Sequence, residues 1–358
     1  MKKIVLTGGG TAGHVTPNIA LLPALQAAGY EIAYVGSYEG IEKKLIADFN
    51  IPYTGISTGK FRRYLDPKNF SDPFRVMKGF VEARNYLKNY QPDVVFSKGG
   101  FVSVPVVRAA ASLHIPCIIH ESDMTPGLAN KLCIPVAEKV CCNFPETMKN
   151  IPADKAVLTG SPIRAELAEG SKLAGLNMCG FTANKPVIMV IGGSLGAANV
   201  NKAVRDALPK LLEDFQVVHL CGKDKIDNLL LNTPGYKQFE YIKAELKDIF
   251  AMADVVISRA GANAICELLA LKKPNILIPL PAASSRGDQL LNAASFEAQG
   301  YSIVLNEDDI TTNLRVDKVH ELYFNRQNYV DAMSKSHQMD AVKTIMELIN
   351  AAADKKTN

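Results

Sequence analysis

The sequence predicts an α/β protein made of two Rossmann-like domains, each with a parallel sheet. Three observations support this. Short, nearly all-apolar runs alternate with helical segments, glycine-rich turns follow two of those runs, and the two turns lie roughly half the chain apart. Strands that are apolar on both faces are typical of parallel sheets covered by helices on each side. With 358 residues, the chain is long enough for two domains of ordinary size.

The apolar runs and the spacing between them set the order of elements and the domain boundary. Helical spacing is clearest from Asn18 to Ala28 and from Asn199 to Glu213. Residues 159–164, which contain glycine and proline, predict a hinge, so we place the domains at 1–163 and 164–358. We leave open whether the last helix packs back on the first domain, and we expect the polar residues 351–358 to fray. Strands are predicted at residues 2–7, 31–36, 92–97, 116–120, 139–143, 186–192, 216–221, 254–258 and 275–280.

The composition excludes several classes of protein. With 47% apolar and 21% charged residues, the chain is typical of a globular protein and not of a disordered one. A net charge of +4 is too small to indicate nucleic acid as a partner. The seven cysteines form no C-x-x-C pair, which favours reduced, buried thiols in a cytoplasmic protein. The first apolar run stops at Gly8, and Arg108 and His114 interrupt the most apolar stretch, so we expect neither a secretory signal nor a transmembrane helix.

The first glycine-rich turn formally matches a dinucleotide-binding fingerprint. Gly8, Gly10 and Gly13 spell G-x-G-x-x-G between a predicted strand and a predicted helix. A dinucleotide site also needs an acidic residue at the end of the second strand, to hold the ribose hydroxyls. Here that strand ends at residues 34–37 without one. A nicotinamide cofactor is therefore disfavoured.

The second glycine-rich turn, residues 192–197, is the better phosphate cradle. Ser194 can donate its hydroxyl, and the helix that follows starts without acidic residues. Residues 258–267 repeat the order of strand end, small-residue loop and helix. Glu267 lies about one and a half turns into that helix, where its carboxylate can hold ribose hydroxyls. A solvent-facing glutamate is the alternative interpretation of Glu267.

His14 is the strongest candidate for a catalytic base. It follows the last glycine of the first turn at the start of a helix, where the positive end of the helix dipole disfavours the imidazolium. This position should lower the pKa of His14 and keep it neutral near pH 7. The alternative interpretation is a capping or sugar-orienting histidine. Glu121, which follows a predicted strand, is the second candidate base.

Six motifs occur in order along nearly the whole chain and together resemble a known family. They resemble the bacterial N-acetylglucosaminyltransferases that convert lipid I to lipid II in peptidoglycan synthesis, with its consequences for cell shape and division. The resemblance implies a GT-B fold, in which two Rossmann-like domains face a cleft. It also implies UDP-N-acetylglucosamine as donor, and undecaprenyl-pyrophosphoryl-N-acetylmuramoyl-pentapeptide (lipid I) as acceptor. Transfer would invert the anomeric centre and form a β-1,4 link. The motifs are residues 9–14, 120–123, 160–164, 192–197, 258–267 and 288–293.

The resemblance also assigns individual residues. It places Ser194 near the UDP phosphates, Glu267 at the ribose and the backbone of Ile242 at uracil. Gln289 would hold the donor sugar, and Arg164 follows the hinge proline. The other residues assigned to donor binding are Thr11, Ala12, Gly13, Asp123, Ala262 and Asn263, and those assigned to an acceptor and phosphate loop are Gly9 and Gly10. We expect no cofactor and no metal, because a helix N-terminus can stabilise the leaving UDP and the chain has no Asp-x-Asp motif.

Residues 61–88 mix basic and aromatic side chains, and the part from 61 to 80 suggests docking on an anionic membrane surface. The protein would then act as a peripheral protein on the cytoplasmic face of the cell membrane. An amphipathic helix packed on the core is the alternative. Interaction with other cell-wall enzymes stays open. The basic residues are Arg62, Arg63, Lys68, Arg75 and Lys78, and the apolar ones are Phe61, Leu65, Phe70, Phe74, Met77 and Phe80.

Two other classes of function fit parts of the pattern. One is another GT-B enzyme that uses UDP-N-acetylglucosamine, either a 2-epimerase or a glycosyltransferase to diacylglycerol. The other is a non-catalytic sensor of nucleotide sugars, which would not need His14. The residues that separate these classes lie in the first half of the chain, at 13–14 and 120–123.

Overall fold

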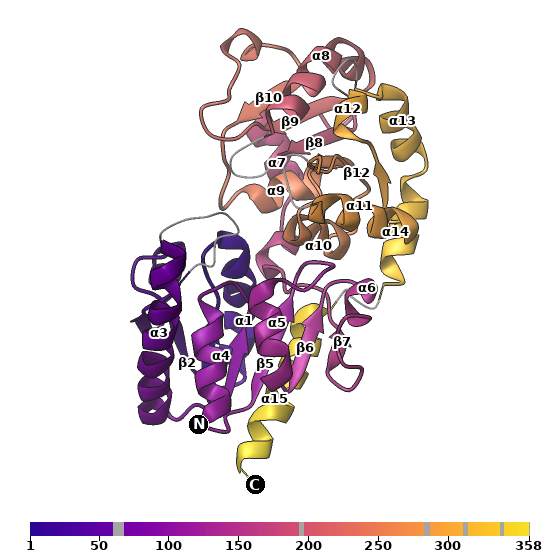
Figure 1. Ribbon diagram of the computed structural model, residues 1–358. Coiled ribbons are helices and arrows are strands. Elements are labelled where there is room, and N and C mark those ends of the chain that lie inside the picture. Colours follow the sequence, from indigo (N-terminus) through magenta and orange to yellow (C-terminus); the bar gives the residue numbers. More distant parts are fainter. Residues whose placement is uncertain (60–67, 193–196, 283–286, 311–313, 337–339, 358) are drawn as a thin grey trace. The chain divides into compact units, whose positions relative to one another are not determined.

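The computed structural model describes residues 1–59, 68–192, 197–282, 287–310, 314–336 and 340–357. It divides into two compact units (Figure 1). Unit 1 comprises Met1–Arg164 and Asp340–Asn358, and unit 2 comprises Ala165–Met339. Unit 1 therefore includes the last helix, α15 (Ala341–Thr357), besides the first 164 residues of the chain.

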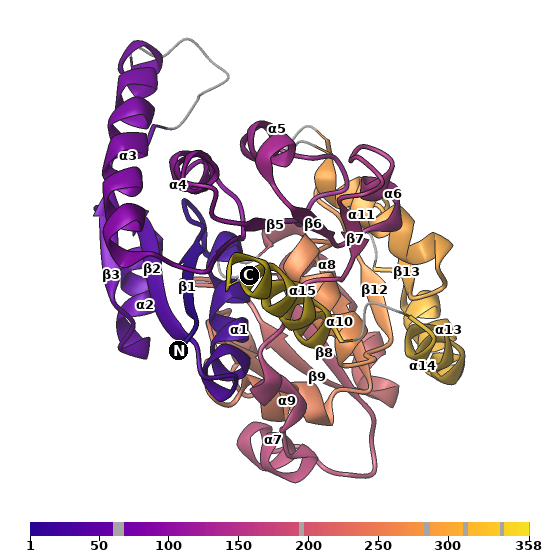
Figure 2. The same cartoon turned by 90° about the horizontal axis from the view of Figure 1, so that it is seen from below.

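Unit 1 is a seven-stranded parallel sheet with helices on both faces (Figure 2). The strand order is β3-β2-β1-β4-β5-β6-β7, as expected for a Rossmann-like domain. Helices α3, α4 and α5 bury one face of the sheet, and α1, α2 and α15 bury the other. The strands are β1 (Lys3–Thr7), β2 (Glu31–Ser37), β3 (Tyr53–Ile56), β4 (Val94–Ser97), β5 (Cys117–Glu121), β6 (Lys139–Cys142) and β7 (Ala156–Leu158). The other helices are α1 (Thr16–Ala27), α2 (Ile41–Ile46), α3 (Lys68–Tyr90), α4 (Ser103–Ser112), α5 (Leu128–Cys133) and α6 (Pro145–Met148).

The C-terminal segment is ordered helix, so the expectation that residues 351–358 fray is wrong for the described part. Ala352 and Ala353 are buried in the same apolar cluster as Leu21 and Ile32. Asp354 forms an ion pair with Lys2 at 2.5 Å. The tail was expected to fray because most of its residues are polar. The two alanines nevertheless pack against the sheet of unit 1 and hold the helix in place.

Unit 2 repeats the architecture with a six-stranded parallel sheet of order β10-β9-β8-β11-β12-β13. Helices α8, α12 and α13 pack against one face of this sheet. The strands are β8 (Val187–Ile191), β9 (Gln216–Leu220), β10 (Tyr236–Phe239), β11 (Val255–Ser258), β12 (Asn275–Leu277) and β13 (Ser302–Val304). The helices are α7 (Lys172–Cys179), α8 (Ala198–Asp214), α9 (Leu246–Met252), α10 (Ala262–Ala270), α11 (Asp288–Ala298), α12 (Glu307–Ile310), α13 (Val316–Phe324) and α14 (Arg326–Ser334).

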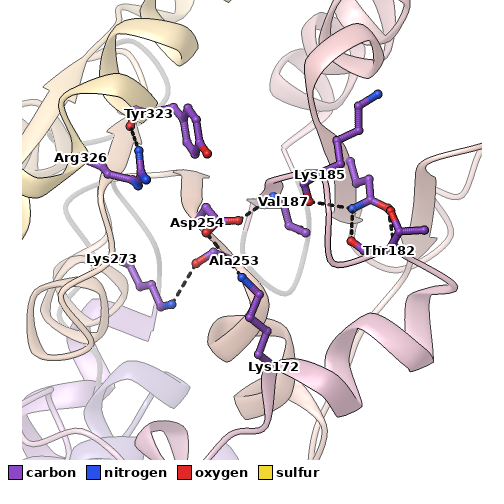
Figure 3. A network of polar contacts seen from close by, with 10 residues as sticks. Lys172, Thr182, Lys185, Val187, Ala253, Asp254, Lys273, Tyr323 and Arg326 are labelled. Carbon is purple, nitrogen blue, oxygen red and sulfur yellow. Dashed lines mark hydrogen bonds and ion pairs between the residues drawn. The ribbon is translucent and has the colours of Figure 1, made fainter.

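A polar network fixes the amino-terminal edge of the sheet in unit 2 (Figure 3). Asp254, which precedes β11, accepts a hydrogen bond from the backbone N–H of Val187 at 2.9 Å. Lys273 donates to the carbonyl of Ala253 at 2.9 Å. Unit 1 has the matching bond, because Asp93 before β4 accepts from the N–H of Lys3 at 2.7 Å. The two units thus share a bond that aligns their first strand with its neighbour, and they leave the opposite edge free for loops.

Two further predictions concerned the state of the cysteines and the presence of a transmembrane helix. All seven cysteines are free and buried, as predicted. Burial raises the pKa of the Cys179 thiol to about 11 and that of Cys133 to about 12. Among the helices of the described ranges, none is long and apolar enough to cross a membrane.

Candidate functional site

Two glycine-rich loops meet at the carboxyl edge of the sheet in unit 1. One follows β1, and the other, residues 98–101, follows its neighbour β4. The N–H of Gly9 donates to the carbonyl of Gly99 at 3.4 Å. Gly100 has a φ of +84°, and a Cβ there would lie 2.3 Å from the carbonyl oxygen of Gly9. Because only glycine tolerates both the conformation and the approach, the two loops form one unit.

The sequence analysis missed the second of these loops. Lys98 and Gly99 directly follow a predicted strand, which was the argument used for the first loop. A Cβ on Gly10 would lie 2.4 Å from the ring of Phe101, so the second loop also packs against the first. The position of the two loops, at adjacent strand ends, was the signal that could have found it.

The N–H groups of Gly9 and Gly10 are bonded within unit 1, which argues against the assignment of these residues to a phosphate loop. The N–H of Gly10 donates to Oε2 of Glu42 at 3.1 Å, and the N–H of Gly9 is taken by Gly99. A phosphate cradle needs its backbone N–H groups directed at the ligand. Here a protein carbonyl and a buried carboxylate occupy those donors, and a carboxylate repels a diphosphate. Thr11 and Ala12, which come next, are exposed.

His14 ends a 3₁₀ turn over Ala12–His14, just before α1. Its Nδ1 is buried and has no hydrogen-bond partner. Burial and, to a smaller extent, the charge of Lys98 lower the pKa of His14 to about 4, although a backbone hydrogen bond with Lys98 acts in the opposite direction. The predicted direction agrees, but burial is the main cause and not the helix dipole. A neutral imidazole can accept a proton.

Lys98 and His120 form the buried polar layer beside His14. Lys98 is 1% exposed and donates to Oγ of Ser122. His120 is fully buried, with Nε2 at 2.9 Å from the carbonyl oxygen of Gly160. Burial lowers the pKa of His120 well below its usual value, and the charges of Lys98 and His14 lower it further. His120 therefore ties the end of β5 to the segment that leaves unit 1.

Glu121 is placed as a loop-holding carboxylate, which argues against its assignment as second candidate base. Its Oε1 accepts from the N–H of Asp123 at 2.9 Å. Its Oε2 accepts from the N–H of Gly127 at 3.0 Å and from Nδ2 of Asn130 at 2.9 Å. The side chain is 3% exposed. Because three donors from this loop and from α5 use both oxygens, this carboxylate holds the loop against the start of α5.

Arg164 is the last residue of unit 1. Its side chain is half-buried, and its Nε is buried without a hydrogen-bond partner. The Oγ of Ser161 is likewise buried and has no hydrogen-bond partner. Buried donors without partners are rare in native structures, so these two groups are candidates for contact with a ligand.

In unit 2, the sheet brings the predicted donor motifs to one edge. Ser258 at the end of β11 pairs in register with Ile191 at the end of β8, so the loops that follow them are neighbours. Ser194 belongs to the first of these loops and lies outside the described residues. The second loop leads through Ala262 and Asn263 into α10, where Glu267 is half-buried.

Buried contacts of Arg259 and Asn292 hold the loop before α10. Arg259 donates to Oε2 of Glu307 at 2.5 Å and to the carbonyl of Ile278 at 3.0 Å. Although burial alone would raise the pKa of Glu307, hydrogen bonds from Arg259 and Asn199 lower it. Nδ2 of Asn292 donates to the carbonyl of Ala260 at 3.1 Å, which links α11 to this loop. The sequence analysis did not single out this ion pair.

Ile242 and Gln289 are both anchored within unit 2. Ile242 is 5% exposed between two exposed neighbours, Tyr241 and Lys243, so its side chain anchors the segment. Gln289, in the first turn of α11, accepts from the N–H of Leu280 through Oε1 at 3.1 Å. Within the part of the chain that the structure describes, no three His, Cys, Asp or Glu side chains are grouped to hold a metal ion.

The two Rossmann-like units limit the class of protein, and comparison with known proteins identifies it. Residues 4–142 match the glycosyltransferase family 28 N-terminal domain, and residues 187–349 match the glycosyltransferase family 28 C-terminal domain. The protein is a glycosyltransferase.

Similar proteins identify which group of enzymes within glycosyltransferase family 28 this chain resembles. A Lachnospira eligens protein named UDP-N-acetylglucosamine–N-acetylmuramyl-(pentapeptide) pyrophosphoryl-undecaprenol N-acetylglucosamine transferase is 65% identical over 98% of this chain and 99% of its own. One of the same name from Lachnoclostridium phytofermentans is 64% identical over 98% of each chain. The crystal structure of Acinetobacter baumannii MurG is similar with a TM-score of 0.76 and 27% identity, over 98% of this chain and 100% of that one. The chain belongs to this family of N-acetylglucosamine transferases within glycosyltransferase family 28.

Proposed function

We propose that the protein transfers N-acetylglucosamine from UDP-N-acetylglucosamine to the 4-hydroxyl of N-acetylmuramic acid in lipid I, with inversion, to form lipid II. The observation that carries this proposal is the identity of 64–65% over 98% of the chain with two relatives named for that transfer. The loops that we assign to substrate contact in both halves fall inside the matched region. The same relatives favour this reaction over a 2-epimerase, a diacylglycerol transferase or a sensor.

In the proposed mechanism, His14 takes the proton of the acceptor hydroxyl. Its imidazole is neutral near pH 7 because burial and Lys98 disfavour the imidazolium. The hydroxyl oxygen then attacks the anomeric carbon, the bond to the UDP oxygen breaks, and the transition state is oxocarbenium-like. Glu121 is a positioning residue here, because its loop carries Asp123. Thr11, Ala12 and Gly13 remain candidates for sugar contact in the segment that leads to His14.

The donor is assigned to unit 2. Glu267 binds the ribose hydroxyls, the backbone at Ile242 meets uracil, and Gln289 faces the sugar. Ser194 and the N-terminus of α8 stabilise the diphosphate as negative charge develops on the leaving group. Ala262 and Asn263 are the other donor-binding residues assigned to unit 2. Those assigned to unit 1 are Thr11, Ala12, Gly13, Asp123 and Arg164. Transfer in this scheme proceeds without a metal ion, so chelation should leave the rate unchanged.

The exposed face of α3 supports docking on a membrane surface. Phe74, Met77 and Val81 are 77%, 63% and 52% exposed and lie at the i, i+3 and i+7 positions of one helix face. Arg75 and Lys78 lie beside them and are exposed. Exposed apolar side chains flanked by basic ones favour an anionic lipid surface. The lipid anchor of the proposed acceptor places that surface at the cytoplasmic face of the cell membrane.

Not all of the predicted membrane-docking region, residues 61–80, belongs to the exposed face of α3. Phe80 packs against the core of unit 1 and is not part of the exposed face. Residues 61–65 lie outside the described residues, as do the side chains of Lys68 and Phe70. The proposed surface is therefore the stripe of residues 74–81 on α3.

The reaction is tested directly with labelled UDP-N-acetylglucosamine and a soluble lipid I analogue. The proposal predicts a β-1,4-linked disaccharide product and stoichiometric UDP. Parallel reactions without acceptor, and with diacylglycerol, test the other classes. Formation of UDP-N-acetylmannosamine, of a glycosylated diacylglycerol, or of no product with any acceptor would each contradict the proposal.

A further inference from the structure

Glu42 places a fully buried carboxylate beneath the first glycine-rich loop. It lies on the short helix α2 and is 0% exposed. Its Oε2 accepts from the N–H of Gly10 at 3.1 Å. Its Oε1 accepts from the N–H of Ser37 at 3.0 Å and from the hydroxyl of Ser37. Three donors therefore converge on the two oxygens, and none of them belongs to a basic side chain.

Three glycines leave the room that this carboxylate occupies. A Cβ on Gly9 would lie 2.5 Å from Cδ of Glu42, and one on Gly40 would lie 2.1 Å from Oε1. A Cβ on Gly36 would lie 2.8 Å from Cγ of Glu42. Contacts this short do not occur between real side chains, so glycine at each position admits Glu42. The side chain of Glu42 is therefore packed closely against the backbone of all three glycines.

Glu42 completes a set of anchors along the loop. Gly8 is held through its carbonyl by the hydroxyl of Tyr34 at 2.7 Å. Gly9 is held through its N–H by Gly99. Gly10 is held by Glu42, and the turn that ends in His14 starts two residues later. The bond to Glu42 is thus the anchor next to the segment that carries the proposed base.

We propose that Glu42 is a positioning residue for transfer, whose carboxylate fixes the Gly10 backbone and through it the placement of His14. The inference rests on the proposed function, in which His14 accepts the acceptor proton. A group that takes a proton in a transition state must be held within a fraction of an ångström, and a misplacement of about 1 Å can cost about a hundredfold in rate. A carboxylate suits this task because all its lone pairs accept.

Glu42→Gln tests the inference with almost no change in shape. A glutamine turns its NH₂ group toward the N–H of either Gly10 or Ser37, so one donor faces another donor. We expect kcat with a lipid I analogue to fall by about tenfold to a hundredfold, with the KM for UDP-N-acetylglucosamine unchanged. Glu39→Gln is the matched control, because Glu39 lies three residues away and is exposed. A wild-type kcat in Glu42→Gln, or a rise in the donor KM alone, overturns the inference.

A double variant separates positioning from general support of the fold. In a His14→Ala background, Glu42→Gln should lower kcat no further, because the group it positions is gone. Losses that multiply in the double variant overturn the inference. If Glu42→Gln does not fold, Ser37→Ala, which removes only the hydroxyl donor, should show a smaller loss with the same non-additivity. If His14→Ala alone keeps its turnover, the proposed base fails, whereas a loss in His14→Ala but not in the Glu42 or Ser37 variants refutes this inference only.

Discussion

The ammonium group of Lys98 donates a hydrogen bond to Oγ of Ser122 inside unit 1. The two residues follow neighbouring strands, β4 and β5, and the lysine is almost fully buried. This places a positive charge beside two histidines, and it lowers the pKa of both His14 and His120 after the larger effect of burial. The protein therefore keeps its candidate base neutral by two means that act in the same direction.

The pH dependence of transfer follows from this arrangement. Because the pKa of His14 lies at about 4, its imidazole should be deprotonated throughout the range from neutral pH down to about pH 5. The acid limb of kcat should then lie near pH 4 and not near the value of about 6.5 that is usual for histidine. Lys98→Met should move this limb to higher pH. An acid limb near pH 6.5 in the wild-type protein would show that His14 is not the neutral base described.

The lowered pKa of His14 can also be tested through the pH dependence of the free energy of unfolding. Between about pH 6.5 and pH 4, an unfolded chain binds a proton on this histidine and the folded chain does not. The free energy of unfolding should therefore rise with pH across this window and decline as pH falls from 6.5 toward 4. In His14→Gln, denaturant titrations should show a weaker decline, while an unchanged decline would assign the effect to other groups.

Glu267 should act on donor affinity. Replacing its carboxylate with Glu267→Ala removes charge-assisted hydrogen bonds to ribose hydroxyls, each worth about 1.5–3 kcal/mol. We expect the KM for UDP-N-acetylglucosamine to rise by about tenfold or more, with kcat within a few-fold of wild type. Glu297→Ala, an exposed position on α11, is the control. A tenfold fall in kcat at unchanged donor KM would place Glu267 in the chemical step instead.

Membrane docking should depend on the apolar stripe of α3. Phe74→Ser combined with Met77→Ser removes two exposed apolar side chains and should weaken binding to anionic phospholipid vesicles by at least about tenfold. Transfer to a soluble acceptor analogue should be unaffected. Phe324→Ser is the matched control, since Phe324 is 74% exposed on unit 2. Equal binding to anionic and neutral vesicles, or unchanged binding of the double variant, would speak against this surface.

The fold was predictable from the sequence wherever strands are buried on both faces. Each of the nine predicted strands is present, with ends shifted by a few residues. The further strands in the described part, β3, β7, β10 and β13, are the edge strands of the two sheets. These edge strands have one neighbour each and are only three or four residues long, so no long apolar run marks them in the sequence. The three residues of β7, for example, are only half-buried.

The candidate site was predictable only where residues lie beside a recognisable turn. His14 follows a glycine-rich turn, and its position could be inferred from that. Glu42 lies on a short helix and has the sequence context of a solvated glutamate, because its burial depends on the end of β2 and on the loop above it. Lys98 could have been found from the glycines that follow its strand. The Arg259–Glu307 pair joins residues 48 positions apart, which no local pattern reveals.

The most direct test of the account is the transfer rate of His14→Ala with both substrates saturating. A positioned general base contributes about a hundredfold to ten-thousandfold, so kcat should fall by that range while donor and acceptor binding stay as in the wild type. His114→Asn is the control, because this histidine is exposed and its φ of +56° is one that asparagine tolerates. A His14→Ala variant that binds both substrates and keeps near-wild-type kcat would contradict the central claim that His14 accepts the proton.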